Sequence, residues 1–238
     1  MTSASIRDFT DHNIDPPVVG FLHTPATSNG DGLVLTHGAG GNAQAPLLRA
    51  IADTFAGAGY AVLRCNLPYR QSRSFGPPSP ADAARDRAGL KNALVALQKS
   101  MGFREGEQSA SGRLYLGGHS YGGRQSSMLC AELSKEEPNL VAGLLLLSYP
   151  LHPPRRPEQQ RTQHLSDLRT PALFVSGTRD PFGTIEELRR AIKMIPAKTR
   201  LMAVEGAGHD LGFKGKAKKE GLLEEILSEF TQFMDLSS

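Results

Sequence analysis

Short stretches with the composition of β-strands alternate along this chain with segments that have the spacing of amphipathic helices. The expected strands are VVGFLH (18–23), GLVLTHG (32–38), YAVLRCN (60–66), RLYLGG (113–118), VAGLLLLS (141–148), PALFVSG (171–177) and RLMAVEG (200–206). The expected helices cover approximately residues 44–57, 80–100, 122–136, 184–195 and 218–234. Strands that alternate with helices pair in parallel, because a parallel connection needs a crossover, and the helices then cover both faces of the sheet. The alternation therefore predicts the α/β class, with a mostly parallel central sheet.

The length of the chain and the continuity of the alternation favour one domain over residues 1–238. Single α/β domains commonly reach this length, and we expect the core to extend from about residue 18 to about residue 236. Two irregular segments rich in proline and arginine interrupt the alternation, PYRQSRSFGPPSPAD (68–82) and the loop at about 149–168. Because irregular loops of this length are more often functional than accidental, both are candidates for a role in function.

Composition and charge argue against several classes of protein. Hydrophobic residues make up 39% of the chain and charged residues 21%, which is typical of a globular protein and not of a disordered or membrane-embedded one. The longest apolar run, VAGLLLLSYP (141–150), is too short to span a bilayer. The net charge of +3 and the lysine run KGKAKK (214–219) give little support for nucleic-acid binding, because no aromatic residues interleave with the lysines.

The N-terminal segment and the cysteines bear on the compartment. MTSASIRDFTDHNID (1–15) is polar and contains no apolar core segment, so it does not resemble a secretory signal. We therefore expect a cytoplasmic protein. Cys65 and Cys130 are too few and too far apart for a disulfide framework or a metal site, and we expect both to be reduced thiols with a structural role.

The segment LGGHSYGGRQ (116–125) places one serine between two pairs of glycines. So many glycines would weaken a helix or a strand, because glycine loses the most conformational freedom on folding. Gly118, Ser120 and Gly122 form the pattern G-x-S-x-G between an expected strand and an expected helix, which is the nucleophile elbow. The pattern alone is weak in a glycine-rich chain, and the strand-turn-helix context gives it weight. It predicts Ser120 as a nucleophile in a tight, strained turn.

A base and an acid follow Ser120 in the order that such a nucleophile needs. A serine hydroxyl is a poor nucleophile unless a base takes its proton, and a third group must fix the tautomer of that base. Asp180 follows one expected strand in TRDPFG, and His209 follows the next in AGHDLG. Both therefore project from the carboxyl edge of the sheet, where open α/β folds bind ligands. We predict His209 as the base and Asp180 as the acid.

Other acids and histidines are weaker candidates. Asp210 and Asp167 compete with Asp180, but Asp210 adjoins His209 and would hardly reach its ring. His12 and His164 lie in polar stretches without a preceding strand, His23 at an early strand end, His152 in a proline-rich loop, and His119 beside the serine in the turn. A neighbour of the nucleophile in a tight turn normally points elsewhere.

The glycine-rich segment LTHGAGGN (35–42) ends another expected strand. Acyl transfer generates an oxyanion, and each preorganised N–H donor that binds it is worth roughly 2.7–4 kcal/mol. The expected donors are the backbone N–H of Tyr121, directly after the nucleophile, and that of Ala39 or Gly40. Taken alone, the segment is also compatible with an ordinary strand-to-helix connection; taken with the other motifs, it predicts an oxyanion hole.

The combined motifs resemble the α/β-hydrolase superfamily, from about Val18 to the C-terminal helix. Within it, they look like the small branch related to dienelactone hydrolases, which includes predicted bacterial hydrolases and animal homologues of the testis-expressed and chromatin-complex-subunit type. The motifs are LTHGAGG (35–41), RCNLPYR (64–70), GGHSYGGR (117–124), SYPLHPP (148–154), GTRDPFG (177–183) and GAGHDL (206–211). The resemblance implies the α/β-hydrolase fold, the triad Ser120, Asp180 and His209, and the oxyanion loop 37–41. Dienelactone hydrolases proper carry a cysteine nucleophile, so their substrate is not carried over to a chain with Ser120.

These observations predict a serine hydrolase that cleaves a carboxylic ester or thioester of a small acyl substrate through an acyl-enzyme intermediate, without a metal or an organic cofactor. Two alternatives stay open. The chain could be a non-catalytic interaction module with the same fold, or a lyase or cofactor-free haloperoxidase that uses the same triad. The oligomeric state is not predicted.

Specificity is the least defined feature. In the superfamily a helical cap often follows the sixth core strand, but the loop at about 149–168 is too short for a large lid. We therefore expect a minimal cap or none, and an open site. Arg70, Arg124, His152, Arg155 and Arg156 are candidates for contacts with the substrate. The arginines would favour acidic substrates, and the alternative is that they are solvated or structural.

Overall fold

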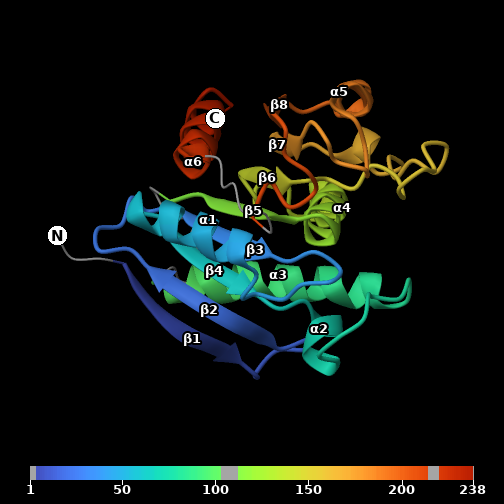
Figure 1. The fold of residues 1–238 in the computed structure, drawn as a ribbon. Coiled ribbons are helices and arrows are strands. Elements are labelled where there is room, and N and C mark those ends of the chain that lie inside the picture. Colours follow the sequence, from blue (N-terminus) through green and yellow to red (C-terminus); the bar gives the residue numbers. More distant parts are fainter. Residues whose placement is uncertain (1–3, 103–111, 214–219, 238) are drawn as a thin grey trace.

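The strands form one eight-stranded sheet in the order β1-β2-β4-β3-β5-β6-β7-β8. In the computed structural model, which describes residues 4–102, 112–213 and 220–237, they are β1 (Ser5–Asp11), β2 (Val18–Thr24), β3 (Gly32–Thr36), β4 (Ala61–Cys65), β5 (Leu114–His119), β6 (Gly143–Leu147), β7 (Ala172–Gly177) and β8 (Thr199–Val204). β2 pairs antiparallel with β1 and β4, and the other neighbours pair in parallel. Figure 1 shows the sheet running from β1 and β2 at one edge to β7 and β8 at the other.

Helices cover both faces of this sheet. They are α1 (Pro46–Gly57), α2 (Pro68–Ser72), α3 (Asp82–Ser100), α4 (Tyr121–Glu136), α5 (Ile185–Ala191) and α6 (Leu222–Asp235), with short 3-10 turns η1 (Leu165–Asp167) and η2 (Ile192–Met194). Side chains of α1 and α6 pack in one buried cluster, and those of α3 and α4 in another. None of the helices seen in the described ranges is long and apolar enough to cross a membrane. The predicted α/β class, with helices on both faces of a mostly parallel sheet, is confirmed.

The alternation of side chains along the strands explains the two clusters. Successive residues of a strand point to opposite faces, so Leu33 and Leu35 of β3 join the cluster of α1 and α6, while Val34 joins that of α3 and α4. β6 is buried at every position, as expected of a central parallel strand covered on both faces.

The structure adds a strand and an α-helix that the sequence pattern did not predict. β1 pairs with β2 along its whole length, but it lies at the sheet edge and most of its side chains are exposed. An exposed edge strand has no buried face, so SIRDFTD gives no apolar period to recognise. The second added element is the short helix α2, with which the irregular segment 68–82 begins. The lysine run 214–219 lies outside the described residues.

The loop at 149–168 contains no cap helix. Its only regular element is η1, so the expectation of a minimal cap or none is confirmed. Tyr149 and Leu151 anchor the start of the loop in the core, and the backbone N–H of His152 donates to the carbonyl of Phe182 at 3.0 Å.

Both cysteines are buried in the core as free thiols. Burial raises the pKa of Cys65 and of Cys130 to about 12. Thiols that are hard to ionise are poor nucleophiles, which agrees with a structural role.

Candidate active site

Ser120 occupies the tight turn between β5 and α4. Its φ of 52° and ψ of −116° place a non-glycine residue in a strained backbone conformation. The turn lies directly against the end of β3: a Cβ atom on Gly118 would be 2.8 Å from the carbonyl oxygen of Thr36, and one on Gly122 would be 2.5 Å from that of His37. Since no side chain fits at either position, the glycines of the elbow are required by close packing.

Three predicted residues meet at this turn. Nε2 of His209 lies 2.8 Å from Oγ of Ser120, and Nδ1 of His209 lies 2.8 Å from Oδ2 and 3.0 Å from Oδ1 of Asp180. A carboxylate can only accept, so Nδ1 carries the proton and Nε2 is left to accept the hydroxyl proton of Ser120. The structure thus brings Ser120, His209 and Asp180 into one chain of hydrogen bonds.

The carboxylate of Asp180 is almost completely shielded from solvent. Its side chain is 1% exposed, against 22% for the ring of His209, and its Oδ1 also accepts the backbone N–H of Phe182 at 2.9 Å. Since both ring nitrogens of His209 are engaged, the ring has no nitrogen left for a second acid. The competing acid Asp167 lies in η1 and is exposed, while Asp210 lines the adjacent cavity.

The predicted oxyanion loop (residues 37–41) leads from the end of β3 towards α1 and lies beside Ser120. Its carbonyl groups are tied back: that of Ala39 accepts the hydroxyl of Tyr69 at 2.9 Å, and that of Gly41 accepts Nε of Arg70 at 2.9 Å. By contrast, the backbone N–H groups of Ala39, Gly40 and Tyr121 donate to no atom of the described residues. The loop and the start of α4 therefore both offer N–H donors next to Ser120.

His37 fixes the start of this loop. Its Nδ1 lies 2.9 Å from the carbonyl oxygen of Gly38, and its Nε2 lies 3.1 Å from the backbone N–H of Leu67. The ring is fully buried, and burial lowers the pKa of His37 to about 4. A neutral imidazole with Nδ1 as donor and Nε2 as acceptor satisfies both contacts.

A cavity of about 680 Å³ opens beside Ser120. Its apolar lining comes from the start of α1 and from two aromatic rings, with Ala45, Pro46, Leu47, Leu48, Phe182 and Phe213 as members. Asp210 is the only lining residue with a carboxylate, and no lysine or arginine lines the cavity among the described residues. In the part of the chain that the structure describes, no cluster of His, Cys, Asp and Glu side chains could hold a metal ion. The site suits a mostly apolar organic group.

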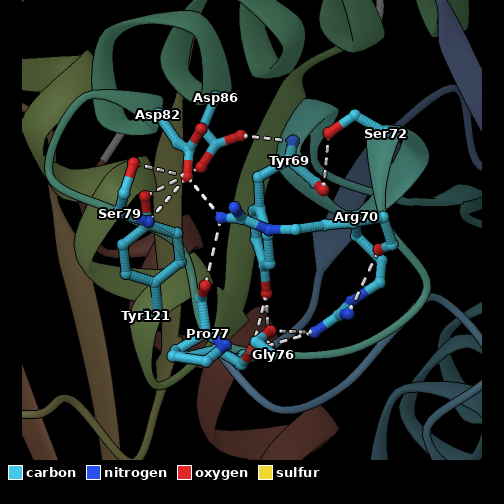
Figure 2. A network of polar contacts seen from close by, with 12 residues as sticks. Tyr69, Arg70, Ser72, Gly76, Pro77, Ser79, Asp82, Asp86 and Tyr121 are labelled. Carbon is cyan, nitrogen blue, oxygen red and sulfur yellow. Dashed lines mark hydrogen bonds and ion pairs between the residues drawn. The ribbon is translucent and has the colours of Figure 1, made fainter.

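The structure does not bring the predicted substrate contacts to this cavity, which none of them lines. The buried guanidinium of Arg70 donates instead to backbone carbonyls, including that of Gly76 at 2.8 Å (Figure 2). His152 is buried against Glu187 and the carbonyl of Pro153. Arg155 and Arg156 are exposed in the 149–168 loop.

Arg124 also lies outside the lining of the cavity. Burial, and then the positive charge of Arg124, lower the pKa of His164 to about 4. Nε2 of His164 lies 2.8 Å from Oγ of Ser127, so the chain contains a second serine–histidine pair. Ser127 is fully buried and a substrate carbonyl cannot reach it.

Several residues around the site were not predicted from the sequence. Nε2 of His119 lies 2.7 Å from the carbonyl oxygen of His209, so the neighbour of the nucleophile holds the segment that carries the base. The ring of Phe182 lies 4.2 Å from that of His209, centroid to centroid. TRDPFG and GGHSYGGR contain these residues, but nothing in the motifs indicates their contacts.

Comparison with known proteins identifies the family of this chain and its fold. The model of a family described as an alpha/beta hydrolase domain matches residues 29–235. A dienelactone hydrolase from Anabaena variabilis is 18% identical, with a TM-score of 0.73 over 99% of each chain. An α/β serine hydrolase without lid from Xanthomonas campestris is 16% identical, with a TM-score of 0.69 over 97% of this chain and 96% of that chain. A Pyrococcus furiosus esterase is 14% identical, with a TM-score of 0.70 over 98% of this chain and 92% of that chain.

Because the identities are only 14–18%, the solved structures show a likeness in fold alone. The family match covers most of the described residues, and the structural relatives include the dienelactone-hydrolase type. The resemblance predicted from the motifs is confirmed.

Proposed function

This chain belongs to the alpha/beta hydrolase domain family, and from that premise we propose that it is a serine hydrolase that cleaves a carboxylic ester or thioester through an acyl-enzyme intermediate. One observation carries the proposal: the hydrogen bonds run without interruption from Oγ of Ser120 through His209 to Asp180. A nucleophile, a base and an orienting acid in this order are the working parts of acyl transfer.

In the first half of the proposed reaction, Nε2 of His209 takes the proton of Ser120 as Oγ attacks the carbonyl carbon of the substrate. The electron pair of the carbonyl double bond moves onto oxygen, where the N–H of Tyr121 and that of Ala39 or Gly40 stabilise the charge. When the tetrahedral intermediate collapses, the protonated His209 donates its proton to the leaving alcohol or thiol.

In the second half, water enters in place of the leaving group. His209 takes a proton from this water, and the resulting attack on the acyl carbon passes through the same oxyanion position. The carboxylic acid leaves, and the hydroxyl proton returns to Ser120. Asp180 stays ionised throughout and stabilises the imidazolium form of His209.

The lining of the cavity supports a preference for neutral, apolar acyl groups. Leu47, Leu48 and Phe213 offer apolar surface next to Ser120, and burial of such surface favours binding by roughly 25 cal/mol per Å². An anionic acyl group would meet the carboxylate of Asp210 and no cationic side chain of the described lining. We therefore expect neutral short-chain and medium-chain esters to be better substrates than dicarboxylic half-esters.

Hydrolysis of aryl esters by matched serine variants tests the proposal. Ser120→Ala should lower kcat by at least about 10⁴-fold, because removal of the nucleophile of a triad leaves only binding and oxyanion stabilisation. Ser127→Ala is the matched control, since Ser127 also contacts a histidine but is buried away from the cavity; it should keep wild-type kcat. Hydrolysis that persists in Ser120→Ala at the wild-type rate would overturn the proposal.

A further inference from the structure

The two halves of the proposed oxyanion hole come from separate segments of the chain. One half is the oxyanion loop after β3, and the other is the N–H of Tyr121 at the start of α4. Oxyanion stabilisation depends on donors that are fixed before the charge develops. The two segments therefore need a common support.

A buried carboxyl group lies between them. Asp86 of α3 is fully buried; its Oδ2 accepts the hydroxyl of Tyr121 at 2.8 Å, and its Oδ1 accepts the backbone N–H of Tyr69 at 3.0 Å (Figure 2). In the described part of the chain, no lysine, arginine or histidine forms an ion pair with Asp86. The pKa of Asp86 is raised, because the effect of burial outweighs that of these two hydrogen bonds, which lower it.

Tyr69 carries this support across to the oxyanion loop. Its backbone is held by Asp86, and at the far end of its side chain the hydroxyl lies 2.9 Å from the carbonyl oxygen of Ala39 and 3.3 Å from that of Gly38. The rings of Tyr69 and Tyr121 also meet edge to face, with 5.9 Å between centroids. The neighbouring Arg70 adds its own bond to the carbonyl of Ala39 at 3.1 Å.

We infer that Asp86 is a positioning residue that joins the two halves of the oxyanion hole, one carboxylate oxygen holding Tyr121 and the other holding Tyr69 and, through it, the oxyanion loop. The inference rests on the proposed function, because it assigns Asp86 a task in acyl transfer. A carboxylate suits this place since it accepts on both sides. An amide keeps one acceptor and turns the other oxygen into a donor.

The first test separates binding from catalysis. Removing an oxyanion donor lowers kcat by roughly 10²–10³-fold, and loosening the donors should have a smaller effect. Asp86→Ala should therefore lower kcat for an aryl ester by about 10- to 100-fold, with KM changed less than about threefold. Its affinity for a trifluoromethyl ketone, which forms an oxyanion on Ser120, should fall by a similar factor, while that for the parent methyl ketone should not. Asp86→Asn should restore part of kcat.

A double-mutant cycle tests whether Asp86 acts through Tyr121. Tyr121→Phe removes only the hydroxyl that Asp86 accepts and keeps the backbone N–H; its kcat should fall by about 3- to 10-fold. Because both variants break the same bond, adding Tyr121→Phe to Asp86→Ala should lower kcat by less than about twofold more. Full multiplication of the two effects would contradict the inference.

Asp82→Asn is the matched control on the same helix. Its carboxylate accepts the hydroxyl and the N–H of Ser79 and pairs with Arg73 (Figure 2). This variant should keep kcat within about twofold of wild type, because it touches neither half of the oxyanion hole.

The outcomes separate this inference from the proposed function. If the wild type hydrolyses esters and Ser120→Ala does not, but folded Asp86→Ala keeps wild-type kcat, the inference alone fails. If the wild type shows no hydrolysis, the proposed function fails and the inference with it. Where Asp86→Ala does not fold, Asp86→Asn and Tyr121→Phe carry the test, and wild-type kcat and ketone affinity in both would overturn it.

Discussion

At the scale of single residues, the site depends on where one proton sits. Both carboxylate oxygens of Asp180 accept the N–H of Nδ1 of His209, and the carboxylate also accepts the backbone N–H of Phe182. This fixes Nε2 of His209 as the acceptor for the hydroxyl of Ser120 at 2.8 Å. In the proposed reaction, a buried carboxylate beside the ring would also stabilise the imidazolium form of His209.

Asp180→Asn should therefore lower kcat by roughly 10³–10⁴-fold with little change in stability, because the amide favours the wrong tautomer of His209. The measurement is steady-state ester hydrolysis, with circular dichroism to check the fold. Asp167→Asn, at the exposed competing acid in η1, should leave kcat unchanged. A loss of less than about tenfold in Asp180→Asn would mean that another group orients the base.

The sequence predicted the residues of the site that follow strand ends and missed those that support them. Ser120, Asp180 and His209 stand in local motifs, and the carboxyl ends of parallel strands meet at one edge, so their convergence follows from the pattern. Asp86 and Tyr69 act through contacts between separate elements. Nothing in the local sequence around Asp86 indicates which groups its carboxyl will meet.

At the scale of elements, the nucleophile elbow is a close contact of three segments. The end of β3 approaches the turn between β5 and α4 so closely that a Cβ atom on Gly122 would be 2.5 Å from the carbonyl oxygen of His37 and 2.7 Å from Cγ2 of Thr36. The same strand end leads into the oxyanion loop. Packing at the elbow and the geometry of the proposed oxyanion hole are thus coupled.

Gly122→Ala should destabilise the protein by about 1–3 kcal/mol, as expected of overpacking against backbone, and should abolish most of the hydrolysis. Gly57→Ala is the matched control: Gly57 ends α1, and a Cβ atom there would meet nothing within 4 Å. It should raise stability by about 0.4–1 kcal/mol. Urea unfolding of both variants gives the comparison, and the opposite order would show that the elbow tolerates a side chain.

The strands were easier to predict than the edges and loops for a physical reason. β6 is apolar at every position because both faces are covered, and such runs stand out in a sequence. β1 is held mainly by backbone hydrogen bonds to β2, which any sequence can form. α2 follows from Pro68 at its first turn, but a helix of five residues is below the length at which periodicity is readable.

At the scale of the whole molecule, the fold gathers distant residues and buries several histidines in doing so. His209 is 29 residues from Asp180 and 89 from Ser120 along the chain, yet the sheet brings all three to one edge. His23 and His37 are fully buried. Burial lowers the pKa of each to about 4, with a further contribution from Arg64 at His23.

Because of these two buried histidines, we expect the free energy of unfolding to fall as the pH falls from 7 to 5. In this window the unfolded chain, with ordinary histidines near pKa 6.5, binds protons that the folded chain does not, so the free energy of unfolding rises with pH. Each fully buried histidine should contribute on the order of 1–2 kcal/mol over this interval. Asp86 has a raised pKa, so its contribution to the free energy of unfolding falls as the pH rises, opposite to that of the histidines. Urea unfolding at pH 5 and pH 7 checks the sign, and equal or greater stability at pH 5 would contradict it.

Covalent labelling of the purified protein with a fluorophosphonate, read by intact mass and peptide mapping, shows whether Ser120 is an activated nucleophile. A fluorophosphonate reacts with an activated serine whatever the natural substrate is. We expect a single adduct, mapped to Ser120 and lost in Ser120→Ala. The absence of an adduct on well-folded wild-type protein, or an adduct that persists in Ser120→Ala, would contradict it.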